Sequence, residues 1–439
     1  MLNRWVEADE LNFIKQYENA HKELEKEIPR QAYATRLLGA ENDLTMHGGG
    51  NTSIKTIIVC EDESKKRALF VKASGTPLSS FLPEHFVVMD LDFLESLKNS
   101  GGLDDEAMAL EFKQRQLLPT GRLPSIESLM HAFIPARVVD HTHPAAILKI
   151  INRVNGRELL KECFGDELAV IPYTKMGYDL ADRSSLAIQQ TPGCIGAVVA
   201  HHGLITWGGD VRDVYDTTIN IINKAEDFLS KKIVKNIKSP KSIIADDIRK
   251  RNFELVTPII KKCLSQASQG VDGTGIPVDK ISLALLDTPD VLELVNSEDG
   301  KDVICNPPMT PDYPMFMRIL PMWMDFNFES SLEEISSYIN KAVNKHVDDY
   351  KDYLKRLDVI NIPSTDLLPH VIVHPQIGAV CFGTDRESAM IIADFTRQAF
   401  SIRRAIFETG GVYESLPEKH LFDMQYRGYQ QTKRHSKNN

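Results

Sequence analysis

The sequence lacks the marks of several large classes of protein. It contains no apolar run close to the roughly 20 residues that a membrane-spanning helix needs. Its 6 cysteines show no Cys-x-x-Cys spacing, so neither a cysteine zinc site nor a disulfide framework is predicted. Its 61 acidic residues outnumber its 51 basic residues, whereas a phosphate backbone demands clustered Lys and Arg. We therefore expect no membrane partner and no nucleic-acid partner.

Two local signals are missing as well. The N-terminal segment Met1–Glu7 carries charges where a secretory signal peptide would be apolar, so we expect a cytoplasmic protein. The Gly-x-Gly-x-x-Gly fingerprint and the Walker pattern of nucleotide-binding loops are also absent. Their absence disfavours a nucleotide cofactor.

The chain is long enough for two domains. With 439 residues, 42% of them hydrophobic and 26% charged, it has the composition of an ordinary globular protein. Helical and strand patterns alternate along it, which predicts an α/β fold. The stretch Lys231–Arg251 contains Ser239-Pro240 and has little apolar periodicity. We place the boundary there, with a first domain over residues 1–235 and a second, smaller α/β domain over residues 252–430.

Hydrophobic periodicity predicts the main helices and strands. Residues 7–40 have the pattern of a helix with Leu11, Ile14 and His21 on one face. A helix over Pro124–Ala136, capped by Ser125, leads into a strand over Val138–His143. The further predictions are strands over Thr52–Cys60, Ala68–Lys72 and Phe86–Asp90, a strand or strand pair over Ile195–Thr206, and helices over residues 211–229 and 332–357.

One internal echo is present. Gly203–Asp210 and Gly378–Asp385 both have the pattern of a strand, a Gly-x-Asp turn and a capped helix. The echo indicates either a decayed duplication, which would make the second domain a degenerate repeat, or a common type of turn used twice. Ile377 stands where the first copy has His202, so a duplicated metal site would have been lost.

Three histidines form the strongest chemical pattern. His141 and His143 are two residues apart in a predicted strand, so their imidazoles lie on one face and can reach one ion. A His-x-His pair alone is more often two ordinary histidines. The pair His201-His202 ends another apolar strand, and only one of these neighbours can join the same site. We choose His202, because Gly203 frees the backbone beside it, and we predict a catalytic zinc site with positions open to substrate.

A carboxylate lies close to this pattern in the sequence. Glu127 falls on the helix just before the His-x-His strand. Beside a divalent cation it can act as a ligand and as a general base. The alternative is a first-turn glutamate favoured only by the helix dipole.

Two small-residue turns have the chemistry of an anion site. Gly48–Ser53 offers backbone amides with amide and hydroxyl side chains, and Ala73–Pro77 is a second hydroxyl-bearing turn that could complete a phosphate cradle with Ser125. A glycine run by itself also marks plain turns.

Taken in order, these segments resemble the class II aldolase/adducin family. The resemblance rests on Gly50–Ser53, Ser74-Gly75, Pro124–Glu127, His141–Pro144 and His202–Leu204, and it covers about residues 30–230. The remainder, through Tyr413–Glu418, is similar to the aldolase part of bifunctional rhamnulose-1-phosphate aldolase/alcohol dehydrogenases. We expect their short-chain dehydrogenase part to be absent, since this chain stops at Asn439.

The resemblance implies a fold and a set of residue roles. The fold would be a three-layer α/β/α domain with a mostly antiparallel central sheet, typically assembled as a homotetramer with sites at subunit interfaces. Zn²⁺, or another divalent metal, would be the cofactor. The metal ligands would be His141, His143, His202 and Glu127, with Glu127 also the catalytic acid/base, and the substrate phosphate would bind Gly50, Asn51, Ser74, Gly75 and Ser125.

The activity implied first is cleavage of a ketose 1-phosphate, such as L-rhamnulose 1-phosphate, to dihydroxyacetone phosphate and an aldehyde through a metal-stabilised enediolate. A tyrosine often serves the aldehyde oxygen in this family, and Tyr173 and Tyr178 are both candidates. Epimerase or dehydratase chemistry and a non-catalytic adducin-like binding module stay open as alternatives. Ile126 and Met176 depart from the common pattern, and the loop at Met176 would shape a different substrate.

Overall fold

The protein is described by a computed structural model covering residues 1–18, 26–60, 63–234, 237, 244–269, 275–359 and 362–425. It divides into two compact units, with the division between Lys232 and Ile233, and the second unit ends at Gln425. The predicted boundary residues Ser239 and Pro240 lie outside the described residues. In the described part of the chain, no helix is both long and apolar enough to cross a membrane.

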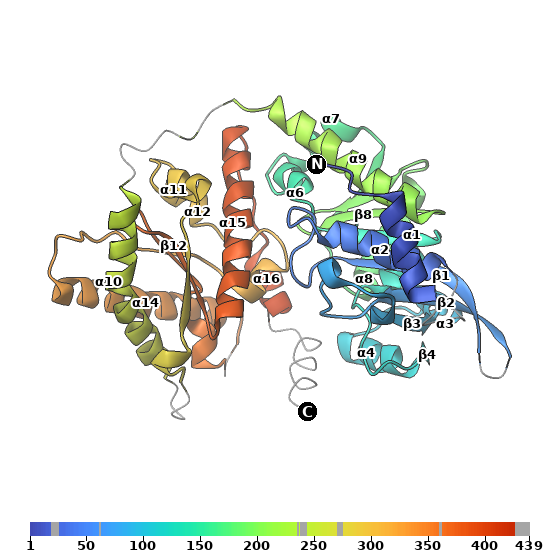
Figure 1. The fold of residues 1–439 in the computed structure, drawn as a ribbon, viewed down its shortest axis with the longest axis horizontal. Coiled ribbons are helices and arrows are strands. Elements are labelled where there is room, and N and C mark those ends of the chain that lie inside the picture. The colour runs from blue at the N-terminus through green and yellow to red at the C-terminus, as the bar shows by residue number, and fades with distance from the viewer. Residues whose placement is uncertain are drawn as a thin grey trace. The chain divides into compact units, whose positions relative to one another are not determined.

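The N-terminal unit is built on an eight-stranded sheet (Figure 1). Its strand order is β4-β3-β2-β1-β5-β8-β7-β6, and every neighbouring pair is antiparallel except β6 and β7. The prediction of a mostly antiparallel sheet is therefore confirmed. The strands are β1 (Asn51–Val59), β2 (Lys65–Lys72), β3 (Phe86–Asp90), β4 (Gln116–Leu118), β5 (Val138–Thr142), β6 (Leu168–Ile171), β7 (Gly196–Val199) and β8 (Gly203–Gly208).

Helices cover both faces of this sheet, which makes three layers. Successive strand residues face opposite ways, so Phe70 packs in one core while Leu69 and Val71 pack in the other. The first core contains α1 (Glu7–Glu18), α2 (Glu27–Gly39), α6 (Ala145–Ile151), α7 (Gly156–Phe164) and α9 (Val211–Ser230). The second contains α3 (Leu91–Ser96), α4 (Asp105–Gln114), α5 (Ser128–Phe133) and α8 (Tyr178–Gln190), and 3₁₀ turns occur at Leu78–Ser80, Pro83–His85 and Leu97–Asn99.

The prediction of one helix over residues 7–40 is wrong. The structure has α1 and α2, and the rings of Phe13 and Tyr33 lie 5.9 Å apart. In an unbroken helix these residues would be about 30 Å apart, since each residue rises about 1.5 Å. Leu11, expected on the apolar face, is 55% exposed, and His21 lies outside the described residues.

The helix expected over Pro124–Ala136 begins later, at Ser128. Pro124 forms an isolated bridge with Ala73, and the Ser125 side chain accepts a hydrogen bond from the Glu127 backbone at 3.2 Å, so this stretch forms a turn. The strand pair expected over Ile195–Thr206 is confirmed as β7 and β8. The helix expected over residues 211–229 is confirmed as α9, which Asp210 caps.

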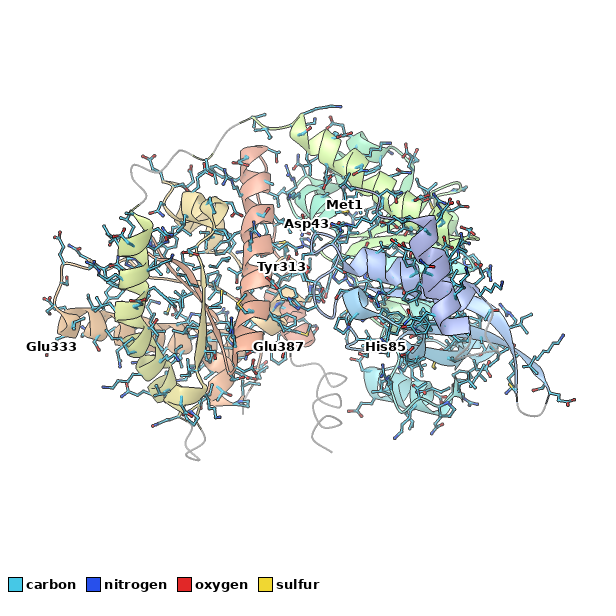
Figure 2. All side chains as sticks on the ribbon, in the orientation of Figure 1. Met1, Asp43, His85, Tyr313, Glu333 and Glu387 are labelled. Atoms are coloured by element: carbon cyan, nitrogen blue, oxygen red, sulfur yellow. The ribbon has the colours of Figure 1, made fainter. Side chains whose placement is uncertain are left out.

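The C-terminal unit has a four-stranded sheet in the order β10-β11-β12-β9. Figure 1 shows α15 on one side of this sheet and α10 and α14 on the other. Figure 2 labels Glu333 and Glu387, which lie in the first turns of α14 and α15. The strands are β9 (Ser282–Leu286), β10 (Met322–Trp323), β11 (Val371–His374) and β12 (Gly378–Gly383). The helices are α10 (Asp246–Ala267), α11 (Pro289–Val295), α12 (Gly300–Ile304), α13 (Tyr313–Met317), α14 (Leu332–Arg356), α15 (Arg386–Glu408) and α16 (Glu418–Gln425), with 3₁₀ turns at Val278–Lys280 and Ser364–Leu367.

This second sheet repeats the topology of half of the first. The order β10-β11-β12-β9 matches β6-β7-β8-β5, and in both sets only the first pair is parallel. Both hairpins close through a three-residue turn, in which His202 N–H donates to Val199 O at 3.1 Å and Ile377 N–H donates to His374 O at 2.9 Å. Asp210 and Asp385 then cap the following helices.

The strand registers show what stands at each matching position. Val138 pairs with Gly208 in the first sheet, and Ser282 pairs with Gly383 in the second. Counting along the strands from this match, Leu285, Asp287 and Ile377 stand where the first unit has His141, His143 and His202. The histidine pattern is thus not repeated.

Candidate metal centre

Three histidine side chains from two neighbouring strands meet in the N-terminal unit. His141 lies in β5 and His143 just after it, while His202 precedes β8, which pairs with β5. The Nε2 atom of His141 lies 3.3 Å from that of His202 and 3.0 Å from that of His143. One ligand atom from each of the three lies within 4.8 Å of the others. The residues that sequence reasoning placed around one ion are therefore close together.

The donor set fits a zinc ion. A tetrahedral ion with Zn–N bonds of about 2.0–2.1 Å places its nitrogen ligands about 3.3 Å apart, close to the observed separations. The Nδ1 atom of His141 donates to the carbonyl oxygen of Leu204 at 3.0 Å. This hydrogen bond selects the tautomer whose Nε2 lone pair faces the other two rings.

Glu127 completes the cluster with a carboxylate. Its Oε1 lies 3.4 Å from His202 Nε2, and its Oε2 lies 3.7 Å from His141 Nε2. The carboxylate is buried, and Oε1 has no hydrogen-bond partner among the described residues. Burying a carboxylate oxygen without a partner costs free energy unless a cation binds beside it. The unpartnered oxygen is therefore a second sign that these residues fit a metal.

The electrostatics keep these groups in the forms that bind metal. Burial alone would raise the pKa of Glu127, but the nearby histidines and the hydrogen bond from Asn51 lower it to about 2. Burial lowers the pKa of His141 to about 3, against the opposing effect of Glu127. The carboxylate is therefore ionised and His141 neutral at physiological pH.

Backbone shape decides which histidine of the pair His201-His202 joins the site. His201 has a φ of 54° in the tight turn, and His202 follows with its side chain fully buried. A Cβ atom on Gly203 would lie 2.3 Å from Thr142 O and 2.8 Å from the His143 ring. Only glycine allows β8 to approach the Thr142 backbone and the His143 ring this closely.

The proposed phosphate-binding segments lie side by side. Ser125 N–H donates to Lys72 O at 3.0 Å, and Lys72 Nζ donates to Gly48 O at 3.1 Å. A Cβ atom on Gly48 would lie 4.0 Å from the Cα atom of Gly75, and Gly75 is exposed. Lys72 thus contacts Ser125 through its backbone oxygen and the glycine cluster through its ammonium, and the cluster lies beside the Ser74-Gly75 turn. Sequence reasoning missed this cation.

Asn51 and His131 add a polar chain beneath Glu127. Asn51 Nδ2 donates to Glu127 Oε2 at 2.6 Å, and its Oδ1 contacts His131 Nε2. The amide expected to bind phosphate is thus already engaged with the carboxylate. Sequence reasoning also missed His131, and the signal that could have found it is its position four residues after Glu127, one helical turn away.

The two tyrosine candidates differ in their contacts. The Tyr178 hydroxyl donates to Lys98 O at 3.1 Å, and its ring packs edge-on against Phe133. Both the hydroxyl and the ring of Tyr178 therefore contact residues of the helices that cover the sheet. Tyr173 lies in the segment between β6 and α8 and is half-buried.

Two family models together match most of the chain. The model for the class II aldolase and adducin N-terminal domain matches residues 30–229, and the model for the second domain of class II aldolases matches residues 251–433. The chain belongs to the class II aldolase and adducin family. The fold is the class II aldolase fold followed by a second domain.

Curated relatives within the family differ in their described activities. An uncharacterized oxidoreductase, YuxG, from Bacillus subtilis is 26% identical over 408 residues, which is 92% of this chain and 58% of that protein. The chain thus spans a little over half of the relative's length. A methylthioribulose-1-phosphate dehydratase from Pectobacterium atrosepticum is 30% identical over 138 residues, which is 27% of this chain and 67% of the dehydratase.

Solved structures described as aldolases or aldolase domains are similar to about half of the chain. The N-terminal class II aldolase domain of a conserved protein from Thermoplasma acidophilum is 31% identical, with 52% of this chain and 99% of that chain covered at a TM-score of 0.46. An L-fuculose-1-phosphate aldolase from Thermus thermophilus is 15% identical, with 46% and 95% covered at a TM-score of 0.31.

Proposed function

We propose that this class II aldolase family member is a zinc-dependent lyase that cleaves a ketose 1-phosphate to dihydroxyacetone phosphate and an aldehyde. L-Rhamnulose 1-phosphate or a close analogue is the proposed substrate. The observation that carries the proposal is the meeting of three imidazole nitrogens with one carboxylate that has an unpartnered oxygen among the described residues. The cluster of small residues around Lys72 supplies a second group suited to the substrate phosphate.

The metal would be held by His141, His143 and His202, with Glu127 beside it. When bound, zinc would draw electron density from the carbonyl and neighbouring hydroxyl oxygens of the substrate, as a Lewis acid does. With such an electrophile bound, no Schiff-base lysine would be required. Gly50, Ser74, Gly75 and Ser125 are the proposed phosphate-binding residues, and Lys72 is added to them.

The chain's own residues move the protons. In the bond-forming direction Glu127, ionised by its low pKa, removes a proton from C3 of dihydroxyacetone phosphate. The electron pair of that bond forms the new bond to the aldehyde carbon, and a tyrosine hydroxyl gives its proton to the aldehyde oxygen. Cleavage reverses each step. Tyr173 and Tyr178 are both candidates for this hydroxyl, and in the structure Tyr178 donates to Lys98 O.

A product analysis tests this proposal. Purified protein with added zinc is incubated with L-rhamnulose 1-phosphate, L-fuculose 1-phosphate and methylthioribulose 1-phosphate. We expect dihydroxyacetone phosphate from a ketose 1-phosphate, detected by its reduction with NADH and glycerol-3-phosphate dehydrogenase. A dehydrated product without dihydroxyacetone phosphate would replace the aldolase assignment with a dehydratase.

Dehydration is the second candidate function, because the curated dehydratase relative matches at 30% identity. The same carboxylate would then remove a proton beside the carbonyl, and a hydroxyl would leave instead of an aldehyde. An epimerase on the same site and a metal-free adducin-like binding module are the remaining alternatives. Absence of bound metal in freshly purified protein would favour the binding module.

The proposal also covers the oligomeric state, the cellular location and the C-terminal unit. We propose a cytoplasmic homotetramer whose sites lie at subunit interfaces, as the family resemblance implies. We also propose that the C-terminal unit, whose sheet repeats β5–β8 in order and direction, is a degenerate repeat of the catalytic unit. Its histidine positions hold Leu285, Asp287 and Ile377, so it would carry no second metal site of this kind.

A further inference from the structure

We propose that His131 is a positioning residue that orients Glu127 through Asn51, by acting as a hydrogen-bond donor. The inference rests on the proposed role of Glu127 as acid/base. It assigns a task to a buried histidine that lies outside the metal cluster. It also gives Asn51 a task other than binding phosphate.

The contacts form a chain of four side chains. Ser53 Oγ lies 2.7 Å from His131 Nδ1, His131 Nε2 contacts Asn51 Oδ1, and Asn51 Nδ2 lies 2.6 Å from Glu127 Oε2. All four side chains are buried, so water cannot substitute for a missing partner. Asn51 and Ser53 share a face of β1, while Glu127 and His131 lie one turn apart at α5, and the chain therefore connects the sheet to the helix.

The carboxylate at one end gives the hydrogen bonds a direction. A carboxylate can only accept, so Asn51 must turn its NH₂ group toward Glu127. Its Oδ1 then faces His131, and His131 must donate from Nε2. The remaining nitrogen, Nδ1, accepts from the Ser53 hydroxyl. Burial lowers the pKa of His131 to about 3, although Glu127 and a hydrogen bond of the ring to the Val139 backbone oppose this effect. The neutral ring therefore carries a single N–H.

This arrangement determines how Glu127 presents its two oxygens. Asn51 holds Oε2, and Oε1 is left facing the histidine cluster. Without the donor at residue 131, the Asn51 amide could rotate and turn its oxygen toward Oε2, which would push the carboxylate out of place. Loss of a partner that orients a metal ligand typically costs about 10–100-fold in metal affinity or activity.

Two substitutions separate donation from packing. In His131→Gln the amide nitrogen reaches the position of imidazole Nε2 and restores the donor to Asn51. In His131→Asn the shorter amide reaches only the position of Nδ1, beside Ser53. We expect His131→Asn to lower kcat about 10–100-fold and to weaken zinc binding similarly, with KM for the sugar phosphate little changed. We expect His131→Gln to keep kcat, KM and zinc affinity close to those of the unsubstituted protein.

Equal behaviour of the Gln and Asn variants, whether both impaired or both normal, would overturn the proposal. If thermal melting shows that neither variant is folded, ¹⁵N-histidine NMR of the unsubstituted protein tests the proposal instead. A proton on Nδ1 of His131 would contradict the proposed series of hydrogen bonds. Zinc affinity measured by chelator competition needs no turnover. A Gln–Asn difference in zinc affinity would therefore support the positioning role even if no aldolase product were found.

Discussion

At the scale of single residues, the metal centre depends on which way each side chain points. His141 and His143 share a face because they are two residues apart, and His201 and His202 cannot share one. These rules were enough to select the three histidines from the sequence. They did not reveal His131, which could have been found only from its position one helical turn after Glu127, or Lys72, because a single lysine at the end of an apolar stretch has no distinguishing pattern.

Replacing Glu127 with Gln tests the acid/base role. The amide keeps the size and the hydrogen-bonding reach of the carboxylate but cannot take up a proton. We expect kcat to fall by about 10²–10⁴-fold while zinc stays bound. Metal analysis and steady-state kinetics on the same preparation check both parts, and a Gln variant with normal turnover would refute the role.

The adjacent histidines provide a matched pair of variants. His202→Ala removes a ligand, and we expect the zinc to be lost on dialysis. His201→Asn should keep the metal, because His201 lies outside the histidine cluster and Asn tolerates its φ of 54°. Zinc content after dialysis is the measurement. Equal zinc in both variants would remove His202 from the site.

At the scale of helices and strands, local signals predicted existence better than boundaries. Asp210 and Ser331 accept N–H groups at the starts of α9 and α14, and both helices begin where they were expected. The helix after Pro124 begins late because Ser125 and Ser128 bond locally to form a turn. The long N-terminal pattern concealed two helices, since periodicity alone does not reveal that a chain doubles back.

The hairpin β11–β12 contains a buried histidine with a stability consequence. His374 accepts from Gln376 N–H and donates to Phe326 O, and burial lowers its pKa to about 4. Below pH 6.5 the unfolded chain binds a proton that the folded unit does not. The free energy of unfolding should therefore decrease as the pH is lowered from about 6.5 to about 4, and His374 contributes at most about 1.4 kcal/mol per pH unit to this decrease. Above pH 6.5 the titration of His374 should not change the free energy of unfolding.

The variant His374→Gln removes the imidazole that binds this proton in the unfolded protein. We expect its urea midpoint to change less between pH 7 and pH 5 than that of the unsubstituted chain. Trp323 reports on this unit when Trp5 and Trp207 are replaced by Phe, because the chain has 3 tryptophans. Identical pH slopes in the two proteins would contradict the assignment.

At the scale of the whole molecule, the proposed metal site belongs to one unit. Zinc that binds only the folded N-terminal unit stabilises that unit by mass action. We expect chelation to lower the unfolding temperature reported by Trp5 and Trp207 in a Trp323→Phe protein. The transition reported by Trp323 alone should not move. A shift of equal size in both would contradict a single site.

The sequence by itself was enough to predict the α/β class, two domains and a set of residues able to hold a metal. It could do so because strand alternation and ligand chemistry are local properties. Only the tertiary structure decided that β5 and β8 pair in a register bringing His202 to His141, that Asn51 turns toward Glu127, and that the second sheet repeats half of the first. Strand pairing joins residues more than 60 positions apart, and no local pattern specifies that register.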